Sequence, residues 1–387
     1  MFNHITIASS VLQDPTHTFL EIDRVLHEIV TQKRPGYIVL PRDMVGITPD
    51  SAFSHSYQQP IQNAVHIQTD LIDKIVSQIN SSQKPVIMAG IGIERYHMES
   101  ALKNLAERGN IPIVSTLLGV LLTDVDMGAN TAVLDPEVML YLSDDSCTIR
   151  RQSFQVQGLM LLPEIINREL IPHDISGCPI PVRDRMPDFV PTGVRVSPEN
   201  LVIALNSIIN DNTVLITEVG DAVMISLDIT MKRTGRFLCN SYYPSLGFGV
   251  PASIGIQAAN PDFRPLVLSG DGAFQMTGME VSTACRYHMN PIVIILNNNG
   301  FGTERPMIDG SFNDVAIWKY HKIPEIIGCG KGYLVQKDTE LAAALEEAYD
   351  SPELSIIEII LDQDDISPQL RRLCSHFSQS VKQNKQV

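Results

Sequence analysis

The sequence predicts an α/β protein built on parallel β-sheets. Helical stripes of apolar residues alternate with short apolar runs along most of the 387-residue chain, and this alternation is typical of βα units. Two passages interrupt the alternation: residues 51–64 are rich in Ser, His, Gln and Pro, and residues 179–191 are rich in Pro. Because the chain is longer than one ordinary domain, these interruptions predict three successive units.

The composition excludes several classes of protein. Hydrophobic residues make up 44% and charged residues 19% of the chain, as in soluble globular proteins. A formal net charge of −15 would repel a phosphate backbone, so we expect no nucleic-acid partner. The first residues lack a basic segment followed by a long apolar run, and no apolar stretch reaches membrane length. The sequence therefore predicts no membrane partner and a cytoplasmic location.

The cysteines are scattered along the chain, and no two of them form a C-x-x-C pair. We therefore expect neither a zinc site nor a disulfide framework, and mostly buried, reduced thiols. They are Cys147, Cys178, Cys239, Cys285, Cys329 and Cys374.

The first predicted unit, residues 1–50, contains one αβ pair. Residues 19–32 place apolar side chains on one helical stripe, and the following RPGYIVLP predicts a short buried strand that ends at a proline. The stripe consists of Leu20, Val25, Leu26 and Ile29. This pair is too small to be a domain, and residues 51–64 are the predicted linker.

The second predicted unit spans residues 65–190. It begins with the helix TDLIDKIVSQIN, capped by Thr69 or Asp70, and continues with strand KPVIMAG, helix MESALKNLAERG and strand IPIVSTLLG. This order predicts a parallel sheet. MAGIGI, which starts at Met88, has the glycines of a dinucleotide loop but lacks the third glycine and the acidic residue, so we interpret it as a packing turn.

The third predicted unit, residues 195–365, has its own βα alternation. The expected helices are PENLVIALNSIIN, VPASIGIQAA and GMEVSTACRYH, and the expected strands are TVLITEVGD, RPLVLSGDG, NPIVIILNNNG and LSIIEIIL. Residues 366–387 are expected to form a loose tail.

Two strands of the third unit run directly into polar and glycine residues. Strand PLVLS is followed by Gly270, Asp271 and Gly272, and strand PIVIIL by residues 297–300, Asn-Asn-Asn-Gly. Because the carboxyl ends of parallel strands meet at one edge of a sheet, these segments should lie together. A carboxylate, an amide oxygen and a backbone carbonyl are hard ligands suited to Mg²⁺, and glycine lets a backbone approach a diphosphate. G-D-G alone is often only a tight turn, but its pairing with N-N across residues 273–296 matches the thiamine-diphosphate (ThDP) fingerprint.

A longer resemblance surrounds this fingerprint. GDGAFQMTGMEVSTACRYHMNPIVIILNNNGFGTERPMIDG, EVGDA at 218–222, YYPSLGFGVPASIG at 242–255 and KPVIMAGIGIERYHMESAL resemble the pyruvate, indolepyruvate and phenylpyruvate decarboxylase family. The resemblance implies an enzyme that removes CO₂ from a 2-oxo acid with ThDP and Mg²⁺. It also implies a fold in which a parallel-sheet ThDP-binding domain follows a shortened Rossmann-like middle domain and a remnant of a pyrimidine-binding domain.

The resemblance assigns most of the site residues. By position, Asp271, Asn298 and the carbonyl of Gly300 would bind Mg²⁺. The cofactor would meet Gly270, the amides of Gly272 and Ala273, the carbonyl of Pro244, the apolar side chain of Leu246, and Asp221 on its aminopyrimidine side. A turn-forming role is nearly as plausible for Asp221.

Glu304 matches the active-site glutamate of that family, with a role in proton transfer. A carboxyl held in a poorly solvated pocket suits such a role. The competing interpretation is a surface glutamate paired with Arg305. Thr303 and Met307 would line the substrate pocket, although a methionine is more often part of a core.

The sequence departs from the family in two places. Full members begin with a pyrimidine-binding domain that supplies a glutamate and a His-His pair, whereas residues 1–50 resemble only the last αβ unit of that domain. In the middle unit STLLG is followed at once by VLLTDVDMGANTAVLDP, which implies missing sheet elements and exposed apolar edges. The start therefore resembles a truncation, and we expect little turnover by the isolated chain because the missing glutamate activates the cofactor.

Two hypotheses follow from these departures. One is a 2-oxo-acid decarboxylase that acts as a homodimer, as a homotetramer or with a partner that supplies a pyrimidine-binding domain, since family sites form between subunits. The other is a catalytically silent remnant that binds the cofactor or dimerises.

Overall fold

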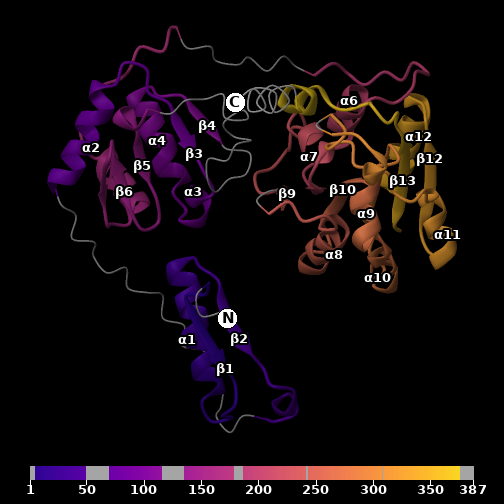
Figure 1. Cartoon of the computed structure of the whole chain (residues 1–387), viewed down its shortest axis with the longest axis horizontal. Coiled ribbons are helices and arrows are strands. Elements are labelled where there is room, and N and C mark those ends of the chain that lie inside the picture. Colours follow the sequence, from indigo (N-terminus) through magenta and orange to yellow (C-terminus); the bar gives the residue numbers. More distant parts are fainter. Residues whose placement is uncertain are drawn as a thin grey trace. The chain divides into compact units, whose positions relative to one another are not determined.

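A computed structural model describes residues 5–48, 69–115, 135–177, 186–240, 243–306 and 308–374. The chain divides into two compact units, one containing the described residues up to 177 and the other those from 186 onward (Figure 1). The predicted linker, the proposed join after STLLG, Cys178 and Met307 lie outside the described residues.

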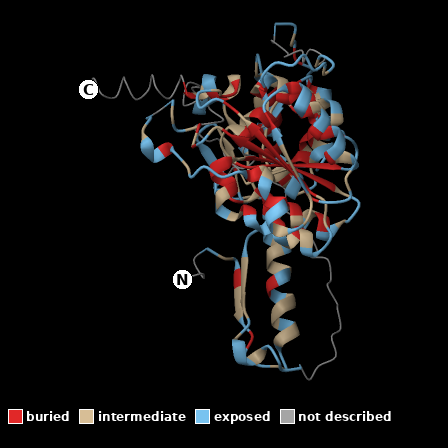
Figure 2. Ribbon diagram, turned by 90° about the vertical axis from the view of Figure 1, so that its right-hand side faces the viewer, coloured by how far each residue is buried: buried red, intermediate tan, exposed pale blue. Residues whose placement is uncertain are grey.

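The second unit is built on a six-stranded, wholly parallel sheet with strand order β12-β13-β11-β10-β8-β9. Its central strands are buried on both faces, which explains their continuous apolar sequences (Figure 2). The strands are β8 (Thr213–Thr217), β9 (Phe237–Cys239), β10 (Arg264–Gly270), β11 (Ile292–Asn297), β12 (Lys331–Val335) and β13 (Ser355–Ile360).

Helices cover both faces of this sheet (Figure 1). Alternating residues of β10 face opposite cores: Leu266 and Leu268 belong to one apolar cluster and Val267 to the other. The first cluster includes side chains of α6 (Pro198–Ile208), α7 (Asp221–Ser226) and α12 (Asp338–Asp350). The opposite face carries α8 (Gly249–Ala259), α9 (Asp271–Thr277), α10 (Val281–Arg286) and α11 (Ile323–Ile327). The predicted parallel α/β fold of this unit is confirmed.

The sequence determines the start of α6 locally. Ser197 and Asn200 form a reciprocal capping box, in which the Asn200 side chain accepts the Ser197 amide at 2.8 Å, and Pro198 occupies the first turn. The cap directs α6 onto the sheet.

The beginning of the predicted tail is packed rather than loose. Residues 368–374 are helical, and Ile366, Leu370 and Cys374 are buried in a small cluster with Met224. These contacts hold the segment against the second unit.

The N-terminal part of the first unit is the expected αβ pair with one additional strand. β1 (Ala8–Val11) pairs in parallel with β2 (Gly36–Val39), and α1 (Thr18–Gln32) connects them. Only Val25 of the predicted apolar stripe is buried, whereas Leu20 and Leu26 are exposed. A short 3₁₀ turn, η2 (Arg42–Met44), follows β2.

The rest of the first unit contains the predicted parallel pair, β3 (Ile87–Ala89) and β4 (Ile113–Ser115). It also contains a three-stranded antiparallel sheet that was not predicted. That sheet consists of β5 (Leu140–Leu142), β6 (Cys147–Ile149) and β7 (Gln152–Phe154). The helices of this region are α2 (Thr69–Ser81), α3 (Gly92–Arg95), α4 (Glu99–Gly109) and α5 (Leu162–Ile166). Two 3₁₀ turns, η3 (Pro136–Val138) and η4 (Gly158–Leu161), complete it.

Two local expectations for this region agree with the structure. A Cβ at Gly92 would lie 2.7 Å from Leu159 Cδ1, so the glycine serves close packing. The expected apolar edge is visible on and beside β3 and β4, where Val86, Ile113 and Val114 are exposed. No helix among the described residues is long and apolar enough to cross a membrane.

The expectation that no disulfide forms is wrong. Cys285, on α10, and Cys329, after α11, are joined as a disulfide across 44 residues of sequence. Their spacing gives no local signal, because the fold alone brings α10 beside the segment that leads into the edge strand β12. Among the described cysteines, Cys147 and Cys374 are free and buried.

Removing this disulfide should lower the free energy of unfolding. Because a crosslink over 44 residues restricts the unfolded chain, Cys329→Ser should cost about 2–4 kcal/mol. Urea unfolding without reductant measures the effect, and Cys239→Ser, which alters a free cysteine, is the matched control. An unchanged unfolding midpoint on adding dithiothreitol to the wild type would contradict the prediction.

Candidate functional site

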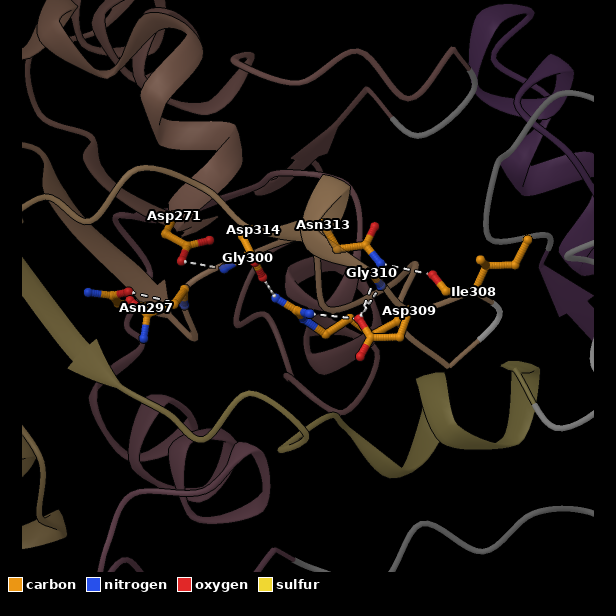
Figure 3. Close-up of polar contacts among 10 residues, drawn as sticks. Asp271, Asn297, Gly300, Ile308, Asp309, Gly310, Asn313 and Asp314 are labelled. Atoms are coloured by element: carbon orange, nitrogen blue, oxygen red, sulfur yellow. Dashed lines mark hydrogen bonds and ion pairs between the residues drawn. The ribbon is translucent and has the colours of Figure 1, made fainter.

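The two polar segments predicted to meet do meet in the structure. Asp271 follows β10 and is only 1% exposed. Its Oδ1 accepts a hydrogen bond from the amide of Gly272 at 2.7 Å, and its Oδ2 accepts one from the amide of Gly300, after β11, at 3.0 Å. Figure 3 shows the contact between Asp271 and Gly300. Two of the three predicted metal ligands are therefore adjacent.

Burial raises the pKa of the Asp271 carboxyl to about 6, because the backbone amides that donate to it are uncharged and offset only part of the lost hydration. A cation placed at the carboxylate would favour its ionised form. Asp271 is thus a buried acid suited to binding a positive ion.

The turn after β11 is held from beneath. Asn297 is 5% exposed, and its Nδ2 donates to Glu358 Oε1 at 2.7 Å. Its Oδ1, drawn in Figure 3, accepts the amide of Asn299 at 3.3 Å. Asn299 has a left-handed backbone with φ of 58°. Asn298 lies between them and is half-buried.

The loop after Gly300 is closed by Arg305, whose side chain is only 8% exposed. The guanidinium donates to Asp309 Oδ1 at 2.7 Å and to Asp314 Oδ1 at 2.6 Å. Asn313 secures the same loop by donating to the carbonyl of Ile308 at 2.9 Å (Figure 3). Among the described ion pairs, Arg305 is joined to these aspartates and not to Glu304, so the pairing in the competing interpretation of Glu304 receives no support.

Glu304 itself is exposed. Its amide donates to the carbonyl of Phe301 at 3.1 Å, which fixes the backbone at this position. The poorly solvated pocket expected for this carboxyl is not supplied by the described residues of the chain.

The loop that contains Glu304 borders a cavity of about 360 Å³, but Glu304 is not one of the lining residues. Its lining combines the loop after Gly300 with the C-terminal segment, and includes Gly302, Arg305, Asp364, Ile366, Arg371 and Cys374. Thr303 lies next to another predicted segment, because a Cβ at Gly220 would be 2.9 Å from Thr303 Oγ1. The predicted substrate residue and the EVGDA segment are therefore neighbours.

The segment predicted to support the cofactor rings is held by Glu218, a residue that the sequence analysis did not single out. Glu218 is buried, and its carboxylate accepts the amides of Gly249 at 2.5 Å and Gly247 at 3.2 Å. Burial raises the pKa of this carboxyl. Pro244 and Leu246 precede these glycines and are exposed.

Asp221 makes its hydrogen bonds to the C-terminal segment. It begins α7, and its carboxylate accepts the amide of Ser367 at 2.8 Å and the Ser367 hydroxyl. Burial raises the pKa of Asp221. The sequence suggested that Asp221 either contacts the cofactor or forms a turn. The structure shows a further role, in which Asp221 anchors Ser367.

The predicted glycines differ in their surroundings. A Cβ at Gly270 would meet nothing within 4 Å, so this backbone is open to a ligand. At Gly272 a Cβ would lie 2.5 Å from the Phe301 ring, so this glycine serves internal packing. Ala273 is buried in the first turn of α9.

These residues fit Mg²⁺ and a diphosphate. The described residues contain no group of three or more His, Cys, Asp and Glu side chains placed to hold a metal. A metal here would therefore rely on one carboxylate, Asp271, with the amide oxygen of Asn298 and the carbonyl of Gly300, the hard donors that Mg²⁺ prefers. The diphosphate would neutralise the remaining charge of the ion.

Comparisons with known proteins agree with this geometry. The family described as "Thiamine pyrophosphate enzyme, C-terminal TPP binding domain" matches residues 218–359, and "Thiamine pyrophosphate enzyme, central domain" matches residues 72–128. The indole-3-pyruvate decarboxylase of Azospirillum brasilense is 26% identical over 96% of this chain and 75% of its own length. The chain belongs to the family of ThDP-dependent 2-oxo-acid decarboxylases.

Other relatives of this ThDP decarboxylase family agree. The pyruvate decarboxylase of Neurospora crassa is 30% identical over 48% of the chain and 34% of its own length. The fold matches that of a ThDP-dependent 4-hydroxybenzoylformate decarboxylase of Rhodococcus jostii, with a TM-score of 0.71 at 18% identity over 94% of this chain and 77% of the other.

In this protein, the substitution Glu218→Gln should lower the free energy of unfolding more at low pH than at high pH. Glutamine has one acceptor oxygen, so one glycine amide loses its partner, at a cost of about 1–3 kcal/mol. Because the folded pKa of Glu218 is raised, the wild type is most stable below the unfolded pKa near 4.5 and loses that stability as pH rises through the folded pKa. Because glutamine does not titrate, the difference in unfolding free energy between the wild type and Glu218→Gln should shrink as the pH rises. Urea unfolding at pH 5 and pH 8 tests this, and an equal difference at both pH values would contradict it.

Proposed function

We propose that this chain carries out the ThDP- and Mg²⁺-dependent, non-oxidative decarboxylation of a 2-oxo acid to an aldehyde and CO₂. The observation that carries the proposal is the contact between the Asp271 carboxylate and the Gly300 amide at the carboxyl ends of β10 and β11. It joins both halves of the ThDP fingerprint at the edge where parallel sheets bind ligands.

The roles of the individual residues follow from their positions. Asp271, Asn298 and the Gly300 carbonyl would hold Mg²⁺. The open backbone at Gly270 and the amide of Ala273 would hold the diphosphate, together with the Gly272 amide once it is released from Asp271 Oδ1. Pro244 and Leu246 would support the aromatic rings, with Asp221 on the aminopyrimidine side. When bound, the cofactor supplies the electron sink for loss of CO₂.

The remaining residues would act on the substrate. Glu304 would hold or transfer a proton at the reacting carbon, and Thr303 and Met307 would line the pocket. Indolepyruvate and pyruvate are proposed substrates because relatives are named for them. Phenylpyruvate is proposed from the sequence resemblance alone.

The decisive experiment measures CO₂ release from these three acids by the purified chain with ThDP and Mg²⁺, beside a calorimetric titration of ThDP. Mg²⁺-dependent ThDP binding is the expected result, and turnover with at least one acid would mean that the purified chain is active without a pyrimidine-binding domain from another chain. Absence of ThDP binding would refute the proposal.

A second candidate is a protein that binds the cofactor without turnover. The exposure of Glu304, Pro244 and Leu246 favours it, because a catalytic pocket needs these groups covered. If this second candidate is correct, the titration will show ThDP binding, and none of the three acids will yield CO₂.

The assembly state decides between the two candidates. We propose a homodimer, a homotetramer or a complex with a chain that supplies a pyrimidine-binding domain, since family sites form between subunits. The proposed location is the cytoplasm. Sedimentation with and without ThDP measures the state of this chain, and appearance of turnover only in a larger assembly would favour the enzyme.

A further inference from the structure

A buried acid lies beneath the candidate metal loop. Glu358 occupies the middle of the apolar strand β13, between the buried Ile357 and Ile359, and is only 2% exposed. Its Oε1 accepts a hydrogen bond from Asn297 Nδ2 at 2.7 Å. Its Oε2 accepts the backbone amide of His321 at 3.0 Å and contacts His321 Nδ1 at 2.5 Å.

Stability alone gives no reason for this arrangement. A carboxylate inside a sheet loses its hydration, and apolar residues of similar volume often replace a buried ion pair without loss of stability. The contacts of Glu358 therefore call for a role that an isoleucine, the residue on either side of it, could not fill. One oxygen of its carboxylate reaches the loop that the proposed function assigns to Mg²⁺.

The link to the loop runs through one side-chain amide. Because Glu358 Oε1 can only accept a hydrogen bond, it fixes the Asn297 amide with Nδ2 toward β13 and Oδ1 toward the loop. Oδ1 then accepts the amide of Asn299, the residue with the left-handed backbone (Figure 3). This geometry shapes the turn that presents Asn298 and Gly300.

We propose that Glu358 is a positioning residue for the magnesium loop, and that it acts through Asn297. This inference rests on the proposed function. Residues that orient metal ligands contribute about 10–100-fold to metal affinity in other proteins, and a similar contribution is expected here.

The test is a Mg²⁺ titration of the full chain at saturating ThDP. Trp318, the only tryptophan of the chain, lies 6.0 Å from the Tyr320 ring, and the Tyr320 hydroxyl is 3.5 Å from the carbonyl of Asp271. The fluorescence of Trp318 should therefore change when Mg²⁺ binds at the site. Calorimetry provides a second measurement of the same binding. Glu358→Gln should raise the half-saturating Mg²⁺ concentration about 10–100-fold, because glutamine has one acceptor oxygen: turned toward the His321 amide, it leaves an NH₂ group facing the donating Asn297 Nδ2.

A matched control uses a nearby carboxylate without a path to the loop. Glu325, on α11, is exposed and pairs with Lys322. Glu325→Gln should leave the half-saturating Mg²⁺ concentration within twofold of the wild type.

A double-mutant cycle tests whether Asn297 carries the effect. Asn297→Ala should raise the half-saturating concentration to a similar extent, and the double variant should be no weaker than the weaker single variant. Multiplying effects, or a Glu358→Gln chain within twofold of the wild type, would overturn the inference.

The remaining outcomes are also decisive. If Glu358→Gln does not fold, as judged by circular dichroism, Asn297→Ala alone decides, and a wild-type Mg²⁺ response in that variant would show that Glu358 serves folding only. A wild-type chain that does not respond to Mg²⁺ at all would refute the proposed function itself.

Discussion

Asp271→Asn is expected to weaken Mg²⁺-dependent ThDP binding at least about 100-fold, because it removes the one carboxylate among the proposed metal ligands. Asparagine keeps the size of the side chain and can still accept one amide hydrogen bond, so the loss would come from charge. Calorimetric titration of ThDP with and without Mg²⁺ measures the effect.

Asp262 provides the matched control for this substitution. It lies in an exposed turn before β10, and its carboxylate is not among the proposed ligands. Asp262→Asn should bind ThDP like the wild type. If Asp271→Asn also binds normally, the metal is not at this loop and the proposed function loses its main support.

The pH dependence of the same variant gives an independent check. The folded pKa of Asp271 is about 6 and its ordinary value is 3.8, a difference that corresponds to about 3 kcal/mol. The raised pKa means that the cofactor-free wild type is most stable below pH 3.8 and loses this stability as pH rises through 6. Asp271→Asn should lack this loss, so its urea midpoint should fall less than that of the wild type between pH 4 and pH 8. Parallel changes in the two midpoints would show that Asp271 does not titrate as described.

The contact between Asp271 and Gly300 could be predicted because two strong local signals coincide. β10 and β11 are continuous apolar runs, and parallel order brings their carboxyl ends to one edge. Polar residues directly after such strands must then lie near each other. The pairing was predictable without any long-range information about the chain.

The support beneath this site could not be predicted in the same way. Asn297 and Glu358 are 61 positions apart, and no periodicity relates them. One signal was present, since a glutamate within LSIIEIIL breaks an otherwise apolar strand and a buried acid needs a partner. The sequence does not name that partner, because only the neighbouring strand order places β11 beside β13.

Other features that were not predicted also depend on tertiary packing or lack a clear local signal. The disulfide joins Cys285 and Cys329 through tertiary packing, and α9 begins inside the glycine motif at Asp271, where the glycines obscure a helix start. The strands β5 to β7 are three residues each, too short for a clear alternation. Length alone did not ensure a prediction, since the 13-residue helix α12 was not among the expected helices.

Glu304→Gln is expected to reduce CO₂ release about 10²–10⁴-fold in any assembly in which the chain turns over a 2-oxo acid. Glutamine preserves the shape of the side chain but cannot take up or release a proton. Glu304 lies between Gly302 and Arg305, which line the cavity, and Arg305 is engaged by Asp309 and Asp314. The Glu304 side chain is exposed, and Arg305 is not paired with it among the described ion pairs.

The reduction should affect turnover and not cofactor binding. Because Glu304 is not a proposed ligand of Mg²⁺ or ThDP, calorimetry should give a ThDP affinity within twofold of the wild type, whereas CO₂ release from phenylpyruvate should fall. Glu346→Gln, an exposed position on α12, is the control and should retain full activity. Equal turnover by Glu304→Gln and the wild type would assign the proton transfer to another group. A fall in both turnover and ThDP affinity would instead mean that Glu304 shapes the cofactor loop, since a residue acting only on protons leaves binding unchanged.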